Sequence, residues 1–125
     1  MKLTVLEDMF SICKLKDYEQ VDLNRPFVFT GSTDEERSLV CPTRLVPAET
    51  LARSDGWRAF RIEGALDFSL VGILARISDI LARDNIGIFA VSTFNTDYIL
   101  TKENDLERAL RLLSSSGWDI NTEHR

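Results

Sequence analysis

The chain has 125 residues, and 15 Lys and Arg stand against 20 Asp and Glu, so its formal charge at neutral pH is −5. This length fits one ordinary domain or two very small ones, and no apolar run approaches the ~20 residues that a membrane-spanning helix needs. An acidic chain without a Lys/Arg cluster argues against nucleic acid as the main partner. Glu7 and Asp8 fall where a signal peptide needs its apolar centre. We therefore expect a cytoplasmic protein with no membrane or nucleic-acid partner.

The first half of the chain carries strand patterns in an irregular arrangement. Four segments alternate or run apolar and predict strands: residues 2–6, 10–15, 27–30 and 38–41. The last two flank the polar tip 31–37, which predicts a hairpin whose second arm ends at Pro42. Residues 47–51 are expected to form a helical turn or two. The polar stretch at residues 53–56 then marks a boundary, so we predict two domains, residues 1–56 and 57–125.

The second half begins with a clearer pattern. Residues 57–63 alternate, with Phe60 and Ile62 on one side, which predicts a strand. Residues 70–84 predict a helix, because their apolar residues fall within an arc of about 120°. That face consists of Leu70, Ile73, Leu74, Ile77, Ile80 and Leu81. Gly72 lies in the first turn of this predicted helix, where glycine is unfavourable. Its presence is explained either by close packing or by the approach of a ligand to the backbone.

The remaining elements complete a known order. Residues 86–94 are apolar on both faces, typical of a central strand covered on both sides, and residues 97–101 return after a turn at Asn95 and Thr96. Residues 103–116 predict a second helix with Leu106, Ala109, Leu110 and Leu113 on one face, and 118–120 a closing strand. The βαββαβ order is ferredoxin-like, so we predict an α+β fold with a smaller strand-rich unit at the N-terminus. Two helices cover only one face of the sheet, so the other face must pack against the first half of the chain or against a second copy of the protein.

No pattern for catalysis or metal binding is visible. The single histidine, His124, lies next to the C-terminus, which removes most His-based catalysis and any multi-His metal site. The glycine-rich loops that bind nucleotide phosphates are absent from the sequence. Cys13 and Cys41 lie in apolar segments, which favours buried thiols over a disulfide or a nucleophile. We expect no enzymatic activity, no cofactor and no metal.

One loop has the chemistry of a binding site. Residues 64–69 lead into the predicted first helix, whose free backbone N–H groups and dipole suit a carboxylate. Asp67 in this loop either accepts a ligand ammonium group or caps the helix, for which Ser69 is the other candidate. A carboxylate receptor and an ammonium receptor in one turn are what recognition of a free α-amino acid requires.

Two runs make the second half resemble the ACT domain, a small βαββαβ module that binds amino acids and other small metabolites. These runs are D-F-S-L-x-G-I-L at residues 67–74 and S-T-x-x-T-D-Y-I-L at residues 92–100. The first half joins the resemblance through residues 10–15, 27–35 and 38–42. The chain is thus similar to short bacterial proteins of two ACT-like units, to the ACT pairs of the CASTOR arginine sensors and to the regulatory ACT domains of aspartate kinases.

The resemblance implies a ligand at the junction between two ACT units. The turn before the first helix would contribute Asp67, Phe68, Ser69, Leu70, Val71 and Gly72, and the facing strand and hairpin Ser92, Thr93, Phe94, Asn95, Thr96 and Asp97. Asp97 either pairs with a cationic ligand group or bonds its own backbone as a turn residue.

The function that follows is an allosteric ligand sensor whose output passes to an unidentified protein partner. We expect a homodimer, because one apolar sheet face and an edge strand lack enough chain to cover them. The alternative is an oligomerisation or protein-interaction module that binds no ligand.

Overall fold

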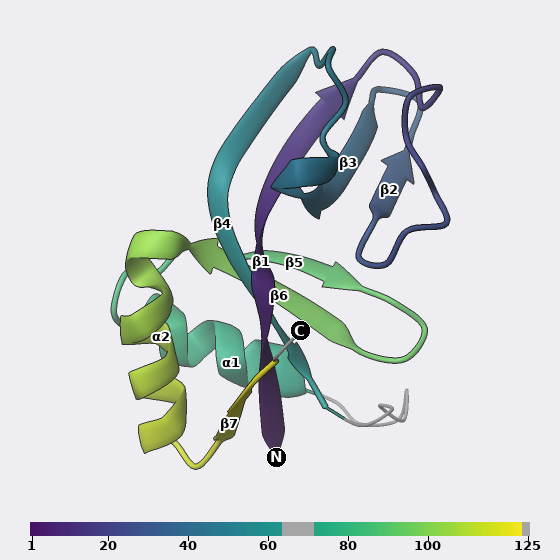
Figure 1. Cartoon of the computed structure of the whole chain (residues 1–125). Coiled ribbons are helices and arrows are strands. Elements are labelled where there is room, and N and C mark those ends of the chain that lie inside the picture. The colour runs from purple at the N-terminus through teal and green to yellow at the C-terminus, as the bar shows by residue number, and fades with distance from the viewer. Residues whose placement is uncertain (64–71, 124–125) are drawn as a thin grey trace. The chain divides into compact units, whose positions relative to one another are not determined.

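The computed structural model describes residues 1–63 and 72–123, and the chain folds into two compact units (Figure 1). Unit 1 consists of Met1–Glu7 and Arg58–Arg125, and unit 2 of Asp8–Trp57. Two long strands, β1 (Lys2–Leu15) and β4 (Ala52–Ile62), contribute residues to both units. The first seven residues, which the sequence assigns to the N-terminal domain, are therefore part of unit 1.

Unit 1 has the predicted order of elements. After β4 follow α1 (Ile73–Ala82), β5 (Phe89–Ser92), β6 (Asp97–Lys102), α2 (Glu103–Ser115) and β7 (Asp119–Thr122). This βαββαβ order confirms the ferredoxin-like α+β fold. Neither helix, within the described part of the chain, has the length and apolar character needed to cross a membrane.

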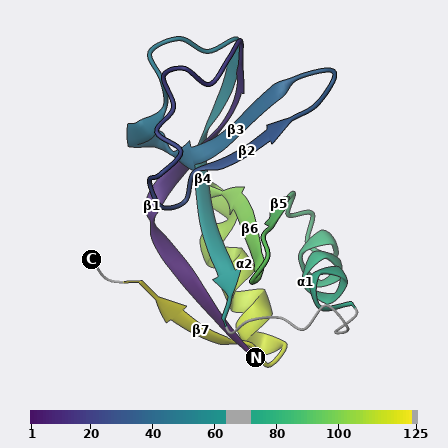
Figure 2. The same cartoon turned by 90° about the vertical axis from the view of Figure 1, so that its right-hand side faces the viewer.

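The sheet of unit 1 includes the N-terminal strand. Its neighbours run in the order β7-β1-β4-β6-β5. The first part of β1 pairs in parallel with β7, with Lys2 opposite Asp119, and the two lie side by side in Figure 2. Strands β5 and β6 pair antiparallel, with Ser92 opposite Asp97. The N-terminal residues thus separate β4 from β7.

The two helices bury the faces that their periodicity predicts. In α1 the buried residues are Ile73, Ile77 and Leu81, and in α2 they are Ala109 and Leu113. They form one core with strand residues that include Leu3, Phe60, Ile62 and Ile99. Leu74, Ile80, Leu106 and Leu110 pack against this core as partly buried residues. Burial of each such aliphatic side chain contributes about 1.5–3 kcal/mol, so this core is the main source of stability in unit 1.

Helix α1 begins later than its prediction. Gly72 lies at the N-cap with φ +84°, in the left-handed region, and Ile73 is the first helical residue. That φ is strained for residues with a Cβ but open to glycine. Gly72 is therefore not in the first helical turn, and its backbone conformation explains why a glycine occupies this position.

Strand β5 contradicts the prediction of a covered central strand. It begins at Phe89 and stands at the end of the strand order. Phe89 and Val91 are half-buried, whereas Ala90 and Ser92 are exposed. The fully buried residues lie on β6 instead. An apolar run reports the character of both faces but not the number of neighbouring strands, and the prediction failed for that reason.

Unit 2 is smaller and built mainly of strands. Strands β2 (Phe29–Ser32) and β3 (Arg37–Pro42) form the predicted hairpin, and β3 pairs antiparallel with the second part of β1. The two strands expected at residues 2–6 and 10–15 are one continuous strand, β1. The prediction of a helical turn at residues 47–51 is wrong, because these residues form no helix. The 3₁₀ turn η1 (Thr43–Leu45) lies earlier and follows β3 directly. Pro42 has φ −53°, which is suited to entering such a turn.

The polar stretch at residues 53–56 precedes the division between the units at Trp57 and Arg58. It lies inside β4, where Gly56 has φ +83°. A left-handed glycine within a strand is typical of a local irregularity in the ladder. The strand thus continues through the stretch and into unit 1.

Candidate functional site

The tip of the β5–β6 hairpin is closed by Thr93 and Thr96. The Thr93 amide donates to the Thr96 carbonyl at 2.9 Å, and the Thr93 hydroxyl donates to the same oxygen at 3.0 Å. The Thr96 amide in turn donates to the Thr93 hydroxyl oxygen at 3.4 Å. These bonds fix the turn, which places Phe94 and Asn95 at its end.

A buried hydrogen bond attaches this tip to β4. The Thr96 hydroxyl donates to the Ile62 carbonyl at 2.7 Å, and Thr96 is only 8% exposed. Ile62 is the last residue of β4, after which the chain continues into residues 64–71. The hairpin tip is thus held beside the end of the strand that leads to the predicted ligand turn.

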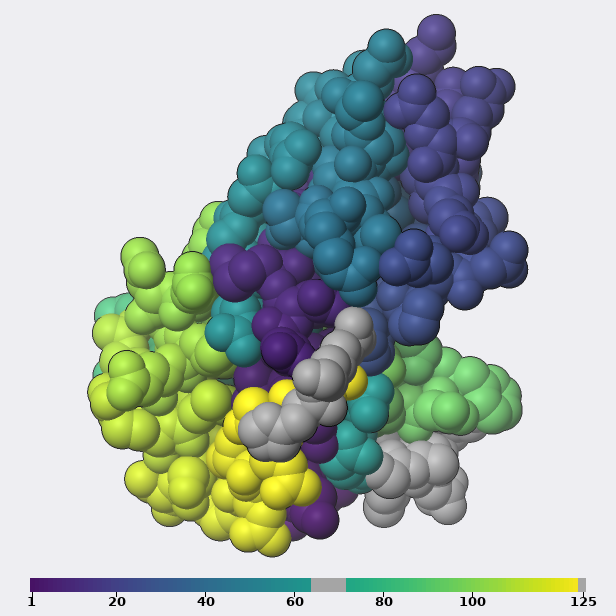
Figure 3. Space-filling model, in the orientation of Figure 1, coloured from purple at the N-terminus to yellow at the C-terminus, as the bar shows by residue number. Residues whose placement is uncertain are grey.

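The other hairpin residues are accessible. Ser92, Thr93, Phe94 and Asn95 are exposed, with Phe94 at 82%, and the green hairpin reaches the surface in Figure 3. Asp97 is half-buried, and its carboxylate has no hydrogen-bond or ion-pair partner among the residues that the structure describes. Thr93 rather than Asp97 closes the turn, so the hairpin-turn explanation of Asp97 is not supported by any bond of its side chain.

Most of the predicted ligand turn lies outside the described residues. This applies to Asp67, Phe68, Ser69, Leu70 and Val71. Gly72 is described, and no described atom lies within 4 Å of the position that a Cβ would take there. Close packing against the described residues therefore does not account for Gly72, whereas its positive φ does.

A charged pair at the end of β4 is a feature that the sequence analysis did not single out. Arg61 Nε lies 2.9 Å from Glu63 Oε1, and the Glu63 amide donates to the Lys2 carbonyl at 2.9 Å. Hydrogen bonding from Arg61, and then from Thr4, lowers the pKa of Glu63. The bond to Glu63 is also the main cause that raises the pKa of Arg61, with the Tyr98 hydroxyl contributing. The alternation of residues 57–63 places Arg61 and Glu63 on the strand face that does not carry Phe60 and Ile62. This shared face is the sequence feature from which the pair could have been predicted.

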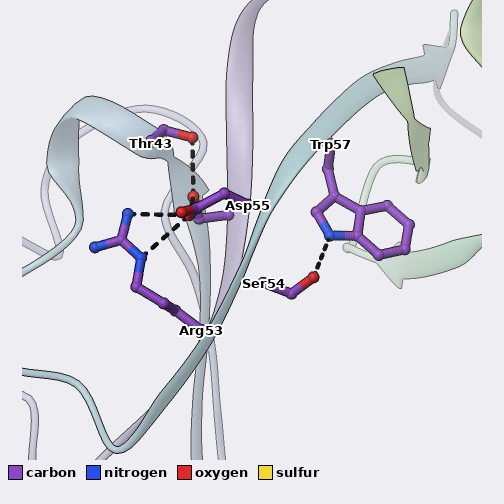
Figure 4. A network of polar contacts seen from close by, with 6 residues as sticks. Thr43, Arg53, Ser54, Asp55 and Trp57 are labelled. Atoms are coloured by element: carbon purple, nitrogen blue, oxygen red, sulfur yellow. Dashed lines mark hydrogen bonds and ion pairs between the residues drawn. The ribbon is translucent and has the colours of Figure 1, made fainter. Parts of the chain in front are cut away.

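Unit 2 contains a closed polar network (Figure 4). The fully buried Ser11 hydroxyl donates to Asp55 Oδ1 at 2.5 Å and shares a hydrogen bond with the Thr43 hydroxyl at 2.9 Å. The same Asp55 oxygen accepts two hydrogen bonds from Arg53, at 2.9 and 3.1 Å. Because the serine is engaged on both sides, this network has the form of a structural link between β1, η1 and β4.

The two thiols are buried and free, as their apolar segments predict. They lie on paired strands, with Ser11 opposite Cys41 and Cys13 opposite Leu39. Burial raises the pKa of both, that of Cys41 to about 11. Each is therefore a protonated, weakly nucleophilic thiol at neutral pH. The described residues include no group of three or more His, Cys, Asp or Glu arranged to hold a metal ion.

Sequence comparison assigns the fold to a family. The ACT domain family matches residues 52–115, which is just over half of the chain. The chain belongs to the ACT domain family. ACT domains are regulatory modules that commonly bind small-molecule ligands and oligomerise. No curated protein sequence matches the chain.

Solved structures show the same fold across the chain. Protein Atu0741 from Agobacterium tumefaciens is 33% identical, with 99% of this chain and 94% of that one covered and a TM-score of 0.87. The regulatory subunit of aspartate kinase from Thermus thermophilus is 11% identical, with coverage of 92% and 96% and a TM-score of 0.64. Aspartate kinase from Synechocystis is 16% identical with a TM-score of 0.72, and 99% of this chain covers 28% of that enzyme. At such identities the two kinase likenesses establish the fold alone.

Proposed function

We propose that this protein is a non-enzymatic sensor that binds a free amino acid at an interface between ACT units and signals to another protein in the cytoplasm. Its membership of the ACT family over residues 52–115 carries the proposal. A ligand acts by stabilising the arrangement of units to which it binds more tightly. The partner protein reads that arrangement.

The proposed ligand residues come from two segments of unit 1. They are Asp67, Phe68, Ser69, Leu70, Val71 and Gly72 on the turn, and Ser92, Thr93, Phe94, Asn95, Thr96 and Asp97 on the hairpin. The Thr96–Ile62 hydrogen bond supports this grouping, because it holds the hairpin tip beside the strand that leads to the turn. Asp97 supports it as well, since a half-buried carboxylate without a side-chain partner among the described residues suits an ammonium or guanidinium group.

The charges divide the roles of these residues. Asp67 and Asp97 are the two carboxylates available for a cationic group of the ligand. Backbone N–H groups at the start of α1 are the donors available for its carboxylate. Thr96 is a positioning residue, because its hydroxyl is already bonded to Ile62.

A homodimer is the proposed assembly. Strand β5 stands at the end of its sheet order with half-buried Phe89 and Val91, and Phe94 is 82% exposed nearby in the chain. An end strand with apolar side chains is suited to pairing with a second copy. Light scattering at micromolar concentration should give twice the mass of the chain, and a monodisperse monomer would contradict the dimer.

The test is a thermal-shift screen of the full chain against the twenty amino acids and common nucleotides. A ligand at 100 times its Kd adds about 2.7 kcal/mol of stability, a shift of several degrees for a chain of this size. The Asp67→Ala and Asp97→Asn variants should lose the shift, whereas Asp119→Asn, at an exposed aspartate of β7, should keep it. Flat curves with all ligands would instead favour the module that only assembles with other proteins.

A further inference from the structure

Unit 2 has a pocket of its own. It is formed by the segment between β1 and β2, by β3 and by η1, and has a volume of about 250 Å³. Its apolar lining consists of Val21, Val28 and Leu45, which also pack against the core of unit 2, together with the buried Cys41. The pocket is thus backed by side chains that the fold already holds in place, as in preformed ligand sites.

The polar lining carries charges of both signs. It includes Arg25, Arg44 and Asp22. Arg44 pairs with Asp8 at 3.5 Å, and its side chain is 49% exposed. Arg25 has no ion-pair partner among the residues that the structure describes. Asp8 already neutralises Arg44, so Arg25 and Asp22 are the lining charges without an ion pair among the residues that the structure describes, and one charge of each sign suits a zwitterion.

Local hydrogen bonds hold the segment that contributes Arg25. The Tyr18 hydroxyl donates to the Ser38 carbonyl at 2.9 Å, which ties the segment to β3. The Val21 amide donates to the Tyr18 carbonyl at 3.1 Å, and the Arg25 amide to the Asp22 carbonyl at 3.4 Å. The pocket wall is therefore made of consecutive closed turns.

Phe27 adds a strained backbone between two lining residues. It has φ +64°, in the left-handed region that a bulky side chain seldom adopts. Its ring packs edge-to-face on Phe10, with 6.4 Å between ring centroids. Such strain persists where surrounding contacts impose it, and it is concentrated at ligand clamps and active sites. Here it fixes the course of the chain between Arg25 and Val28.

We propose that this pocket binds a small carboxylate with an aliphatic side chain. Arg25 holds the carboxylate, and the side chain lies against Val21, Val28 and Leu45. Asp22 supplies an acceptor for an ammonium group, so an aliphatic α-amino acid binds better than the corresponding 2-oxo acid. The site belongs entirely to unit 2, so its test is independent of the test of the hairpin site of unit 1.

An NMR titration of the isotope-labelled full chain with leucine and with its 2-oxo acid tests the proposal. Leucine at millimolar concentration should shift the backbone signals of Val21, Asp22, Arg25 and Leu45 saturably. Arg25→Gln should weaken binding of both compounds about tenfold or more. The matched control is Arg111→Gln, at an exposed arginine of α2, which should bind as the wild type does.

A second variant tests the ammonium contact. The Asn24 amide donates to Asp22 Oδ1 at 3.0 Å, and Asp22→Asn keeps an acceptor at that position while it removes the charge. This variant should weaken leucine and leave the 2-oxo acid unchanged. Absence of saturable shifts, shifts confined to unit 1, or wild-type affinity in Arg25→Gln would overturn the site. Tighter binding of the 2-oxo acid than of leucine would overturn the role of Asp22.

Discussion

The hydrogen bond from Thr96 to Ile62 determines how firmly the hairpin tip is attached to β4. A Thr96→Val variant keeps the shape of the side chain and removes only the hydroxyl that donates at 2.7 Å. Thr96 is 8% exposed and Ile62 is fully buried, so water cannot replace the lost donor freely. Removing one partner of a buried hydrogen bond costs about 1–3 kcal/mol. For a chain of this size that corresponds to a fall in Tm of about 4–11 °C.

Urea unfolding followed by circular dichroism measures this cost. The matched control is Thr30→Val, at an exposed threonine of β2, which should change stability by less than about 0.5 kcal/mol. Both variants should unfold with the wild-type m-value, because neither alters the surface exposed on unfolding. If Thr96→Val unfolds at the same urea concentration as Thr30→Val, the hydrogen bond does not hold the tip and the reasoning is wrong.

Three further predictions concern single residues. Gly72→Ala should lower the free energy of unfolding by about 1–2 kcal/mol, because φ +84° is strained for alanine; Gly87→Ala is the control in urea unfolding. Iodoacetamide should alkylate Cys41 about 100-fold more slowly in the native protein near pH 8 than in urea, because burial raises the thiol pKa to about 11. Arg61 lowers the pKa of Glu63, so their pair stabilises the fold above the unfolded pKa of 4.5 and loses this effect as pH falls through the folded pKa. Glu63→Gln should therefore cost about 0.2–1 kcal/mol at neutral pH and nothing in strong acid, as pH-dependent unfolding would show.

The helices were predictable because their signal is local. Residues three and four apart share one face, so Ile73, Ile77 and Leu81 identify the buried side of α1 without any knowledge of its neighbours. The same holds for Ala109 and Leu113 of α2. The order of elements follows from these periods and from the turns between them, and the ferredoxin-like fold follows from that order.

Strand neighbours were not predictable in this way. The pairing of Lys2 with Asp119 joins the two ends of the chain, and no local pattern records it. It brings the first seven residues into unit 1, although their composition matches that of the strands of unit 2. The error in β5 has the same origin, since an end strand and a central strand can share one composition.

The β5–β6 hairpin was predicted, but the interactions of its individual residues were not. Ser92, Thr96 and Asp97 do lie on a β-hairpin, as the alternation and the turn residues predict. The buried bond of Thr96 was not foreseen, because its partner is the carbonyl of a residue on another strand. A threonine in a polar turn looks the same in the sequence whether its hydroxyl faces solvent or a buried carbonyl.

This difference within the hairpin separates folding from binding by experiment. Thr96→Val removes a bond that exists without ligand, so it should lower the stability of the free protein. Asp97→Asn changes a carboxylate that has no side-chain partner among the described residues, so it should leave the free protein unchanged and reduce only the stabilisation by ligand. The free energy of unfolding is measured for both variants with and without an amino acid. Thr96→Val should lower the value without ligand, and Asp97→Asn should lower only the increase that the ligand causes. A loss of free-protein stability in Asp97→Asn would place that carboxylate in the fold rather than in the ligand site.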